Sequence, residues 1–146
     1  MKNSGNRRNF IRILTMAIPA SLFTRKLSSA TPGLSPVKKI DGSFRHHVFF
    51  WLKNPDNEEE RKVFLDNLTS FLEKVDVILS VHVGEPAETQ REIVDNSYHY
   101  DLLVTFKDKK DQDIYQEHPA HEKFVDDTSR LWTKVLVYDS LSVWPI

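Results

Sequence analysis

The most informative stretch of this chain reads Tyr115-Gln116-Glu117-His118-Pro119-Ala120-His121-Glu122-Lys123-Phe124 and contains a Tyr-x-x-His-Pro-x-His string. Proline lacks a backbone N–H and disfavours helical geometry in the residue before it. We therefore expect one helix to end near Tyr115, His118 to lie at a break, and Pro119 to begin a second helix. The break brings Tyr115, His118 and His121 toward one point, where a phenol and two imidazoles suit binding a polar ligand or moving a proton.

Hydrophobic patterns upstream of this stretch predict three elements. Residues 44–53 alternate with period two, which predicts a strand with one face formed by Phe44, His46, Val48, Phe50 and Leu52. Residues 57–75 have apolar side chains at helical spacing and predict a helix, in which Asn57 and Glu60 resemble a capping box. Residues 77–83 alternate again and predict a second strand, and the polar residues 85–97 predict a loop.

The pattern downstream completes the fold prediction. Residues 98–106 predict a third strand, Asp108 caps the short helix that ends near Tyr115, and residues 135–143 predict the last strand. The order is β-α-β-β-α-β, which is typical of the ferredoxin-like fold in the α+β class, with an antiparallel sheet and the helices on one face. We expect Phe124, Val125 and Leu131 to continue the apolar stripe of the second helical region.

The opposite face of this sheet has no cover within the chain. Phe49 and Trp51 are expected to lie exposed there, and His47 to lie at a dimer contact or at the surface. A large bare apolar face predicts a partner, and a self-complementary two-fold contact is the commonest solution, so we expect a homodimer.

Composition narrows the function classes. Hydrophobic residues make up 40% and charged residues 28% of the 146 residues, as in ordinary globular proteins. The net charge of -1 gives no electrostatic argument for nucleic acid as a partner. The chain has no Cys, which excludes disulfides, zinc–thiolate sites and thiol nucleophiles.

The first residues differ from the rest. Residues 1–30 contain Arg7, Arg8 and other basic residues but no Asp or Glu, and their apolar stretch, residues 13–23, is too short to span a bilayer. This pattern predicts a signal peptide, 1–30, cleaved after Ala30, so the mature protein has no membrane span. A basic disordered tail is the alternative. Residues 31–43 have a linker composition, and we expect the folded domain at 44–144.

Two resemblances follow from these residues. Arg7-Arg8-Asn9-Phe10-Ile11-Arg12 resembles the twin-arginine export signal, which implies export in a folded state, to a bacterial periplasm or to the outside. Residues 44–141 resemble the stress-responsive dimeric α/β-barrel (Dabb) family, through the opening strand, the strand Tyr100-Asp101-Leu102-Leu103-Val104-Thr105-Phe106, the Tyr-x-x-His-Pro-x-His string and Val135-Leu136-Val137-Tyr138-Asp139. The Dabb resemblance implies that two sheets pack face to face as a dimeric barrel.

The Dabb resemblance also implies a pocket. One family member is a plant polyketide cyclase that closes a ring by an aldol step without a cofactor. Similarity to it implies polar pocket positions at His46, Tyr115 and His121, with Tyr100 where the cyclase has a His. It implies an apolar wall formed by Phe64, Leu65, Leu68, Phe124 and Trp132, with Leu68 where the cyclase has a Tyr.

Three functions remain open. The favoured one is binding of a small hydrophobic or aromatic molecule in this pocket. The second is a cofactor-independent enzyme in which His121 acts as general base and Tyr115 donates a hydrogen bond to a developing enolate oxygen. The third is a structural dimer in which Tyr115 and His121 only close the helix break and His46 is a core histidine. A metal site formed by His46, His118 and His121 is disfavoured because no carboxylate spacing supports it, so we expect no metal and no cofactor.

Overall fold

The computed structural model describes residues 40–143. The predicted signal peptide (1–30), most of the predicted linker (31–43) and Trp144 lie outside the described residues. Within 40–143, no helix combines the length and hydrophobicity needed to cross a bilayer.

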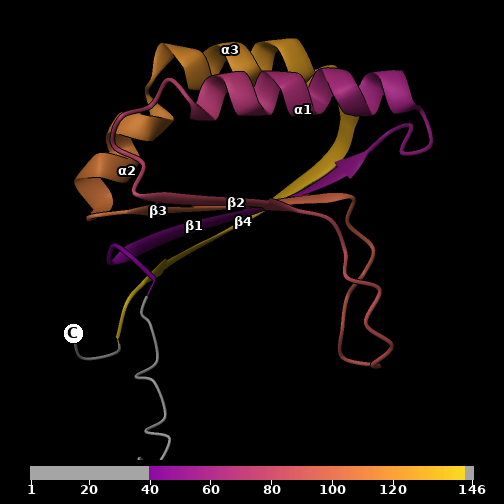
Figure 1. The fold of residues 1–146 in the computed structure, drawn as a ribbon, viewed down its shortest axis with the longest axis horizontal. Helices are drawn as coiled ribbons and strands as arrows, with labels where there is room; N and C mark the ends of the chain where they lie inside the picture. The colour runs from indigo at the N-terminus through magenta and orange to yellow at the C-terminus, as the bar shows by residue number, and fades with distance from the viewer. Residues whose placement is uncertain (1–39, 144–146) are drawn as a thin grey trace, which may run out of the picture. The chain divides into compact units, whose positions relative to one another are not determined.

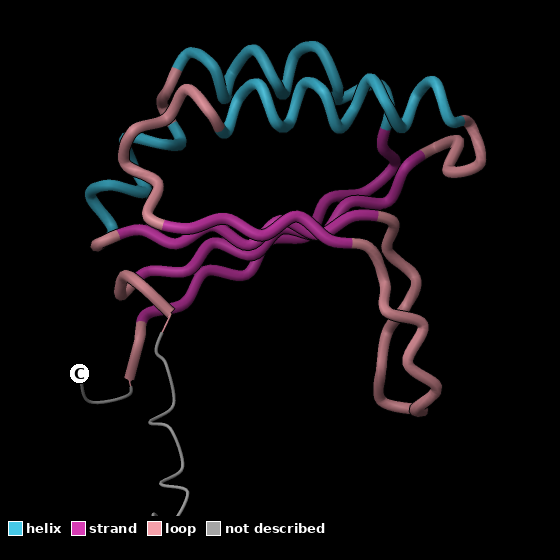
Figure 2. Tube along the Cα trace, in the orientation of Figure 1, coloured by secondary structure: helices cyan, strands magenta, loops and turns pink. Residues whose placement is uncertain are grey.

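The elements follow the predicted β-α-β-β-α-β order, with the second helical region divided in two (Figures 1 and 2). In chain order they are β1 (Phe44–Leu52), α1 (Glu58–Leu72), β2 (Ser80–Gly84), β3 (Tyr100–Phe106), α2 (Lys109–Gln116), α3 (Pro119–Thr128), a 3₁₀ turn η1 (Ser129–Leu131) and β4 (Trp132–Leu141). All strand pairs are antiparallel, in the order β2-β3-β1-β4. The predicted ferredoxin-like fold is confirmed.

The central strand β1 organises the molecule because it pairs with both β3 and β4. Its residues alternate between buried and half-buried along its whole length, as the period-two pattern predicts. The buried face includes His46 among apolar residues and lies under the helices, which cover one side of the sheet (Figure 1). Phe64 of α1 is fully buried against this face and stacks on Tyr100 of β3.

The helix α1 is held at its start by Asn57, which is its N-cap. The Asn57 side chain accepts hydrogen bonds from the backbone N–H groups of Glu59 and Glu60. The reciprocal half of the predicted capping box is absent, because the Glu60 carboxylate accepts from the Asn54 amide instead. The helix ends at Leu72, earlier than predicted, and Val75 is buried in the core beyond its end.

Three strands begin elsewhere than predicted. β2 starts at Ser80 because Val77 and Ile78 pack against the core before the chain joins the sheet. β3 starts at Tyr100, not at residue 98. β4 starts earlier, at Trp132, because a register shift at Trp51/Leu52 lets Leu52 pair with Trp132. The predicted loop over 85–97 is confirmed.

The break between α2 and α3 has the predicted geometry. His118 is extended, with φ -70 and ψ 132, and its Nδ1 accepts the backbone N–H of Ala120 at 3.1 Å. Pro119 occupies the first turn of α3, where a missing N–H costs nothing. Asp108 caps α2, also as predicted. The His118 side chain is therefore used locally as a helix cap.

The sheet face away from the helices is less bare and less apolar than predicted. Phe49 and Trp51 are half-buried, because the loop before β3 places Tyr98 against Phe49, with ring centroids 5.0 Å apart, and the Lys134 ammonium lies 3.9 Å from the Trp51 ring centroid. His47 lies on this face and bonds Asp101 at 3.0 Å. The predicted exposure of Phe49 and Trp51 was wrong, because that prediction ignored the loop.

Candidate functional site

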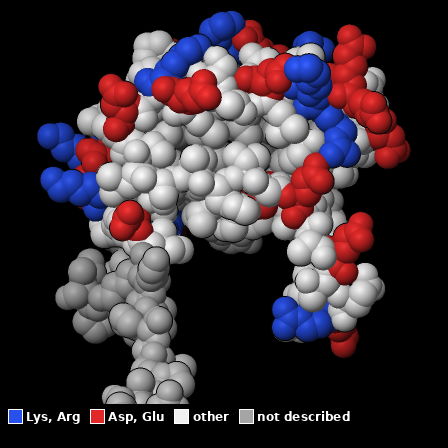
Figure 3. All heavy atoms as spheres, in the orientation of Figure 1, with Lys and Arg blue, Asp and Glu red and all other residues white. Residues whose placement is uncertain are grey.

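A cavity of ≈ 420 Å³ lies between the helices and the sheet, toward the edge strand β4. Helix-facing residues of β1 and β4 line it on one side and residues of α2 and α3 on the other. Its polar lining residues are His46, Gln112, Tyr115, Gln116, His121 and Asp139. The space-filling view shows charged side chains gathered over the helices, with a largely uncharged surface below them (Figure 3).

His46 and Asp139 form the first polar feature of the cavity. The antiparallel register of β1 and β4 places these two residues directly opposite each other. His46 Nδ1 lies 2.7 Å from Asp139 Oδ1, with the imidazole 7% and the carboxylate 46% exposed. Because a carboxylate accepts, the imidazole carries its proton on Nδ1, which leaves Nε2 as an acceptor when the ring is neutral. The pair thus orients the imidazole.

Tyr115 lies between the two histidines. Its ring centroid is 5.4 Å from that of His46 and 5.1 Å from that of His121, so the three rings form a continuous row. The side chain as a whole is buried in the fold and lines the cavity. Burial, together with the charge of Asp139, raises the pKa of Tyr115, so the phenol stays protonated and can donate to a ligand oxygen.

His121 is positioned by the helix break. Its Nδ1 lies 3.0 Å from the backbone carbonyl oxygen of Gln116, the last residue of α2. A carbonyl only accepts, so Nδ1 donates and Nε2 keeps its lone pair in the neutral ring. Burial is the main reason that the pKa of His121 is lowered, and neighbouring His46 adds to the effect. The side chain therefore has the properties of a neutral base at pH 7.

The remaining wall is apolar. Phe124 and Trp132, both predicted as pocket residues, line the cavity beside Phe50, Val135 and Val137. Val125, predicted as part of the core stripe, is 37% exposed and also lines the cavity. An apolar wall with a polar row at one side is the usual composition of a small-molecule site.

The other predicted pocket residues lie outside this lining. Phe64 and Leu68 are buried in the core, and Leu65 packs against it. The Tyr100 hydroxyl accepts from Arg61 Nε at 2.9 Å, at the far end of α1. Ligand-binding roles for these four residues stay predictions.

Sequence reasoning missed Asp139, Gln112 and Gln116. Asp139 had a usable signal, since it is in phase with Val135 and Val137 on a strand whose helix-facing side is otherwise apolar. The two glutamines had none, because polar residues on a short helix usually face solvent. In the described part of the chain, no three His, Asp or Glu side chains are grouped to hold a metal ion.

The comparison with protein families decides the classification. Residues 44–142 match the stress responsive A/B barrel domain, Dabb. This chain belongs to the Dabb family. The predicted resemblance is thereby confirmed over nearly the whole described part. No curated protein matches the chain significantly.

Solved structures agree with this membership. A Dabb protein with a ferredoxin-like fold from Mesorhizobium loti is 26% identical, with a TM-score of 0.59 over 70% of this chain and 98% of that one. A dimeric ferredoxin-like protein of unknown function from Bacteroides fragilis is 19% identical, with a TM-score of 0.55 over 71% and 100%. A hydroxynitrile lyase from Passiflora edulis is 13% identical, with a TM-score of 0.62 over 72% and 97%. The last two show likeness of fold alone.

The lowered pKa of His121 predicts a pH dependence of stability. Because the folded-state pKa lies below the unfolded value of about 6.5, the folded protein binds fewer protons. The contribution of neutral His121 is therefore complete above about pH 6.5 and is lost as the pH falls through the folded-state pKa. We expect His121→Gln to reduce this loss of stability at low pH. The measurement is the free energy of unfolding in urea at several pH values between about pH 8 and about pH 5. His82→Gln, outside the cavity, is the control, and parallel profiles for all three proteins contradict the prediction.

Proposed function

We propose that the cavity binds a small, mainly apolar molecule that presents one polar oxygen to the row of His46, Tyr115 and His121. The observation that carries this proposal is the row formed by His46, Tyr115 and His121 at the wall of ≈ 420 Å³ of mostly apolar space. The Tyr115 hydroxyl can donate a hydrogen bond to a ligand oxygen in the cavity, and the neutral histidines can accept from a ligand hydroxyl. The apolar wall supplies affinity and the polar row supplies orientation.

Filling the cavity mouth should remove binding. Val137 lines the cavity and is 43% exposed, so Val137→Trp adds bulk there without emptying the core. We expect 2-naphthalenemethanol to shift backbone NMR signals of cavity residues in the full chain, and Val137→Trp to weaken this binding at least about tenfold, or about 1.4 kcal/mol. Leu141→Trp, 62% exposed on the same strand, is the matched control. Equal affinity of both variants, or shifts outside the cavity, would contradict the proposal.

A second candidate function is cofactor-independent acid–base catalysis, and the two oriented imidazoles favour it. His121 Nε2 takes a proton from a carbon next to a bound carbonyl, and the electron pair of that C–H bond forms the enolate. Tyr115 donates a hydrogen bond to the enolate oxygen, and the imidazolium returns the proton. Asp139 keeps His46 fixed at the other end of the row. The fold accommodates an enzyme, since a hydroxynitrile lyase shares it.

This chemistry is testable without knowing the natural substrate. We expect the full chain to accelerate exchange of the methyl protons of 2-acetonaphthone in D₂O. His121→Gln should reduce the protein-dependent rate by about 10²–10⁴-fold, the usual contribution of a general base. Tyr115→Phe should cost about 10²-fold. NMR titration of each variant checks that the ketone still binds. An unchanged exchange rate in His121→Gln removes this residue from the mechanism.

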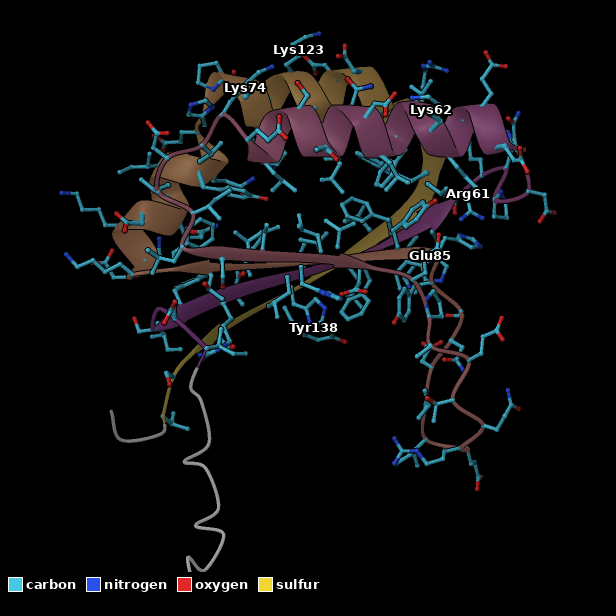
Figure 4. All side chains as sticks on the ribbon, in the orientation of Figure 1. Arg61, Lys62, Lys74, Glu85, Lys123 and Tyr138 are labelled. Atoms are coloured by element: carbon cyan, nitrogen blue, oxygen red, sulfur yellow. The ribbon has the colours of Figure 1, made fainter. Side chains whose placement is uncertain are left out.

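We also propose that the chain forms a homodimer through the sheet face away from the helices. The solved relative from Bacteroides fragilis is dimeric. On this face Phe49 contacts the ring of Tyr138, which is 60% exposed and points away from the helices (Figure 4). Burying such aromatic surface against a second copy stabilises a two-fold contact.

Light scattering tests the dimer. We expect a mass of twice the 17.0 kDa subunit, and Tyr138→Asp should shift the protein toward the monomer because it places a charge in an apolar contact. Ile114→Asp, on an exposed position of α2, is the control and should remain dimeric. A soluble wild-type monomer at micromolar concentration contradicts the proposal.

Export stays a proposal based on sequence. The paired Arg7 and Arg8 followed by a short apolar stretch support twin-arginine export to a bacterial periplasm. Fusing residues 1–35 to a reporter tests it, with the expectation that Arg7→Lys plus Arg8→Lys abolishes export. Undiminished export of the double variant contradicts the twin-arginine reading.

A further inference from the structure

We infer that the cavity selects uncharged or cationic ligands and rejects anionic ones, such as carboxylates and phosphate esters. This inference rests on the cavity function proposed above and adds the charge class of the ligand. It comes from the sign of every charged group at the cavity and its mouth.

The cavity itself has one carboxylate and no basic side chain of Lys or Arg in its lining. Asp139 is 46% exposed, so it faces the cavity and the solvent. Its pairing with His46 gives a net charge of -1 with a neutral imidazole and zero with a protonated one. In neither state does the pair attract an anion.

The surface beside the cavity adds two further carboxylates. A shallow hollow there shares Gln116, His121 and Val125 with the cavity lining and is completed by Glu122 and Asp126. Both are exposed, and neither forms an ion pair with another residue in the described range. A ligand that enters past His121 therefore meets uncompensated negative charge.

Lys123 of α3 and Arg61 of α1 have partners outside the cavity lining. Lys123 lies on the outer side of α3 in Figure 4 and pairs with Asp127 at 2.6 Å. Arg61 contacts Glu85 and the Tyr100 hydroxyl at the other end of α1. His121 does not compensate, since burial lowers its pKa. Tyr115 lines the cavity and offers a neutral hydroxyl donor that suits an uncharged oxygen.

Three ligands that share a naphthalene ring test the inference on the full chain: 2-naphthalenemethanol, 2-naphthalenemethylamine and 2-naphthoate, which are neutral, cationic and anionic at about pH 7. NMR titration should give a dissociation constant for naphthoate at least tenfold above that of the alcohol. The amine should bind at least as tightly as the alcohol. The double variant Glu122→Gln plus Asp126→Asn should reduce the ratio of the naphthoate and alcohol dissociation constants, here called the affinity gap, at least threefold. High salt should also reduce this affinity gap, because exposed charges are screened.

A matched control neutralises two carboxylates far from the cavity. Glu88 and Glu92 lie in the exposed loop on the other side of the sheet (Figure 1). The double variant Glu88→Gln plus Glu92→Gln should leave the affinity gap between alcohol and naphthoate unchanged. Equal affinity for all three ligands, or a gap that neither the Glu122/Asp126 variant nor salt reduces, overturns the charge selection and leaves the cavity function standing. Absence of binding by all three overturns both.

Discussion

A buried imidazole in an apolar strand face requires a hydrogen-bond partner, and the cavity depends on how His46 obtains one. Four apolar residues share the helix-facing side of β1 with His46, and all are buried. The partner comes from β4, where the antiparallel register places Asp139 opposite. A slip of one residue would turn Asp139 to the other sheet face and leave His46 unpaired. The same contact therefore favours one register and supplies the polar end of the site.

The helix break supplies the opposite side of the row. A continuous helix through residues 109–128 would bond the Gln116 carbonyl to a backbone N–H four residues on. Pro119 and the extended His118 interrupt that pattern, and the Gln116 carbonyl accepts from the His121 ring instead. One backbone group released by the break thus fixes the tautomer of His121. The two histidines reach Tyr115 from different elements but are oriented by the same principle, a proton held on Nδ1 by an oxygen acceptor.

Most of the fold was predictable because local patterns and long-range packing agree. Alternation in β1, the Asn57 cap and the His118–Pro119 break each specify an element from a few neighbouring residues. The predicted boundaries of elements were wrong where contacts between residues distant in sequence determine them. β4 begins at Trp132 because of its pairing with Leu52, and that register shift has no local signature.

The site was predictable to the extent that it depends on local geometry. Tyr115 and His121 follow from the helix break, and the resemblance to the Dabb family added His46. The phase of Asp139 with Val135 and Val137 places it on the helix-facing side, but its pairing with His46 required the register between β1 and β4, which sequence periodicity does not give. Tyr100 has the same phase as the cavity-facing Leu102, but its hydroxyl is taken by Arg61. Facing the helices is thus not the same as lining the cavity.

Binding and catalysis make different demands on this row of side chains. A ligand oxygen that accepts from Tyr115 gains the same hydrogen bond whether or not a reaction follows. Catalysis needs an interaction that becomes stronger as negative charge develops on that oxygen. Burial and the charge of the neighbouring Asp139 both work against such charge, and both raise the pKa of Tyr115. An enolate would form only if the His121 imidazolium, created by the same proton transfer, offsets that repulsion. The arrangement thus favours bound ligands that carry no negative charge.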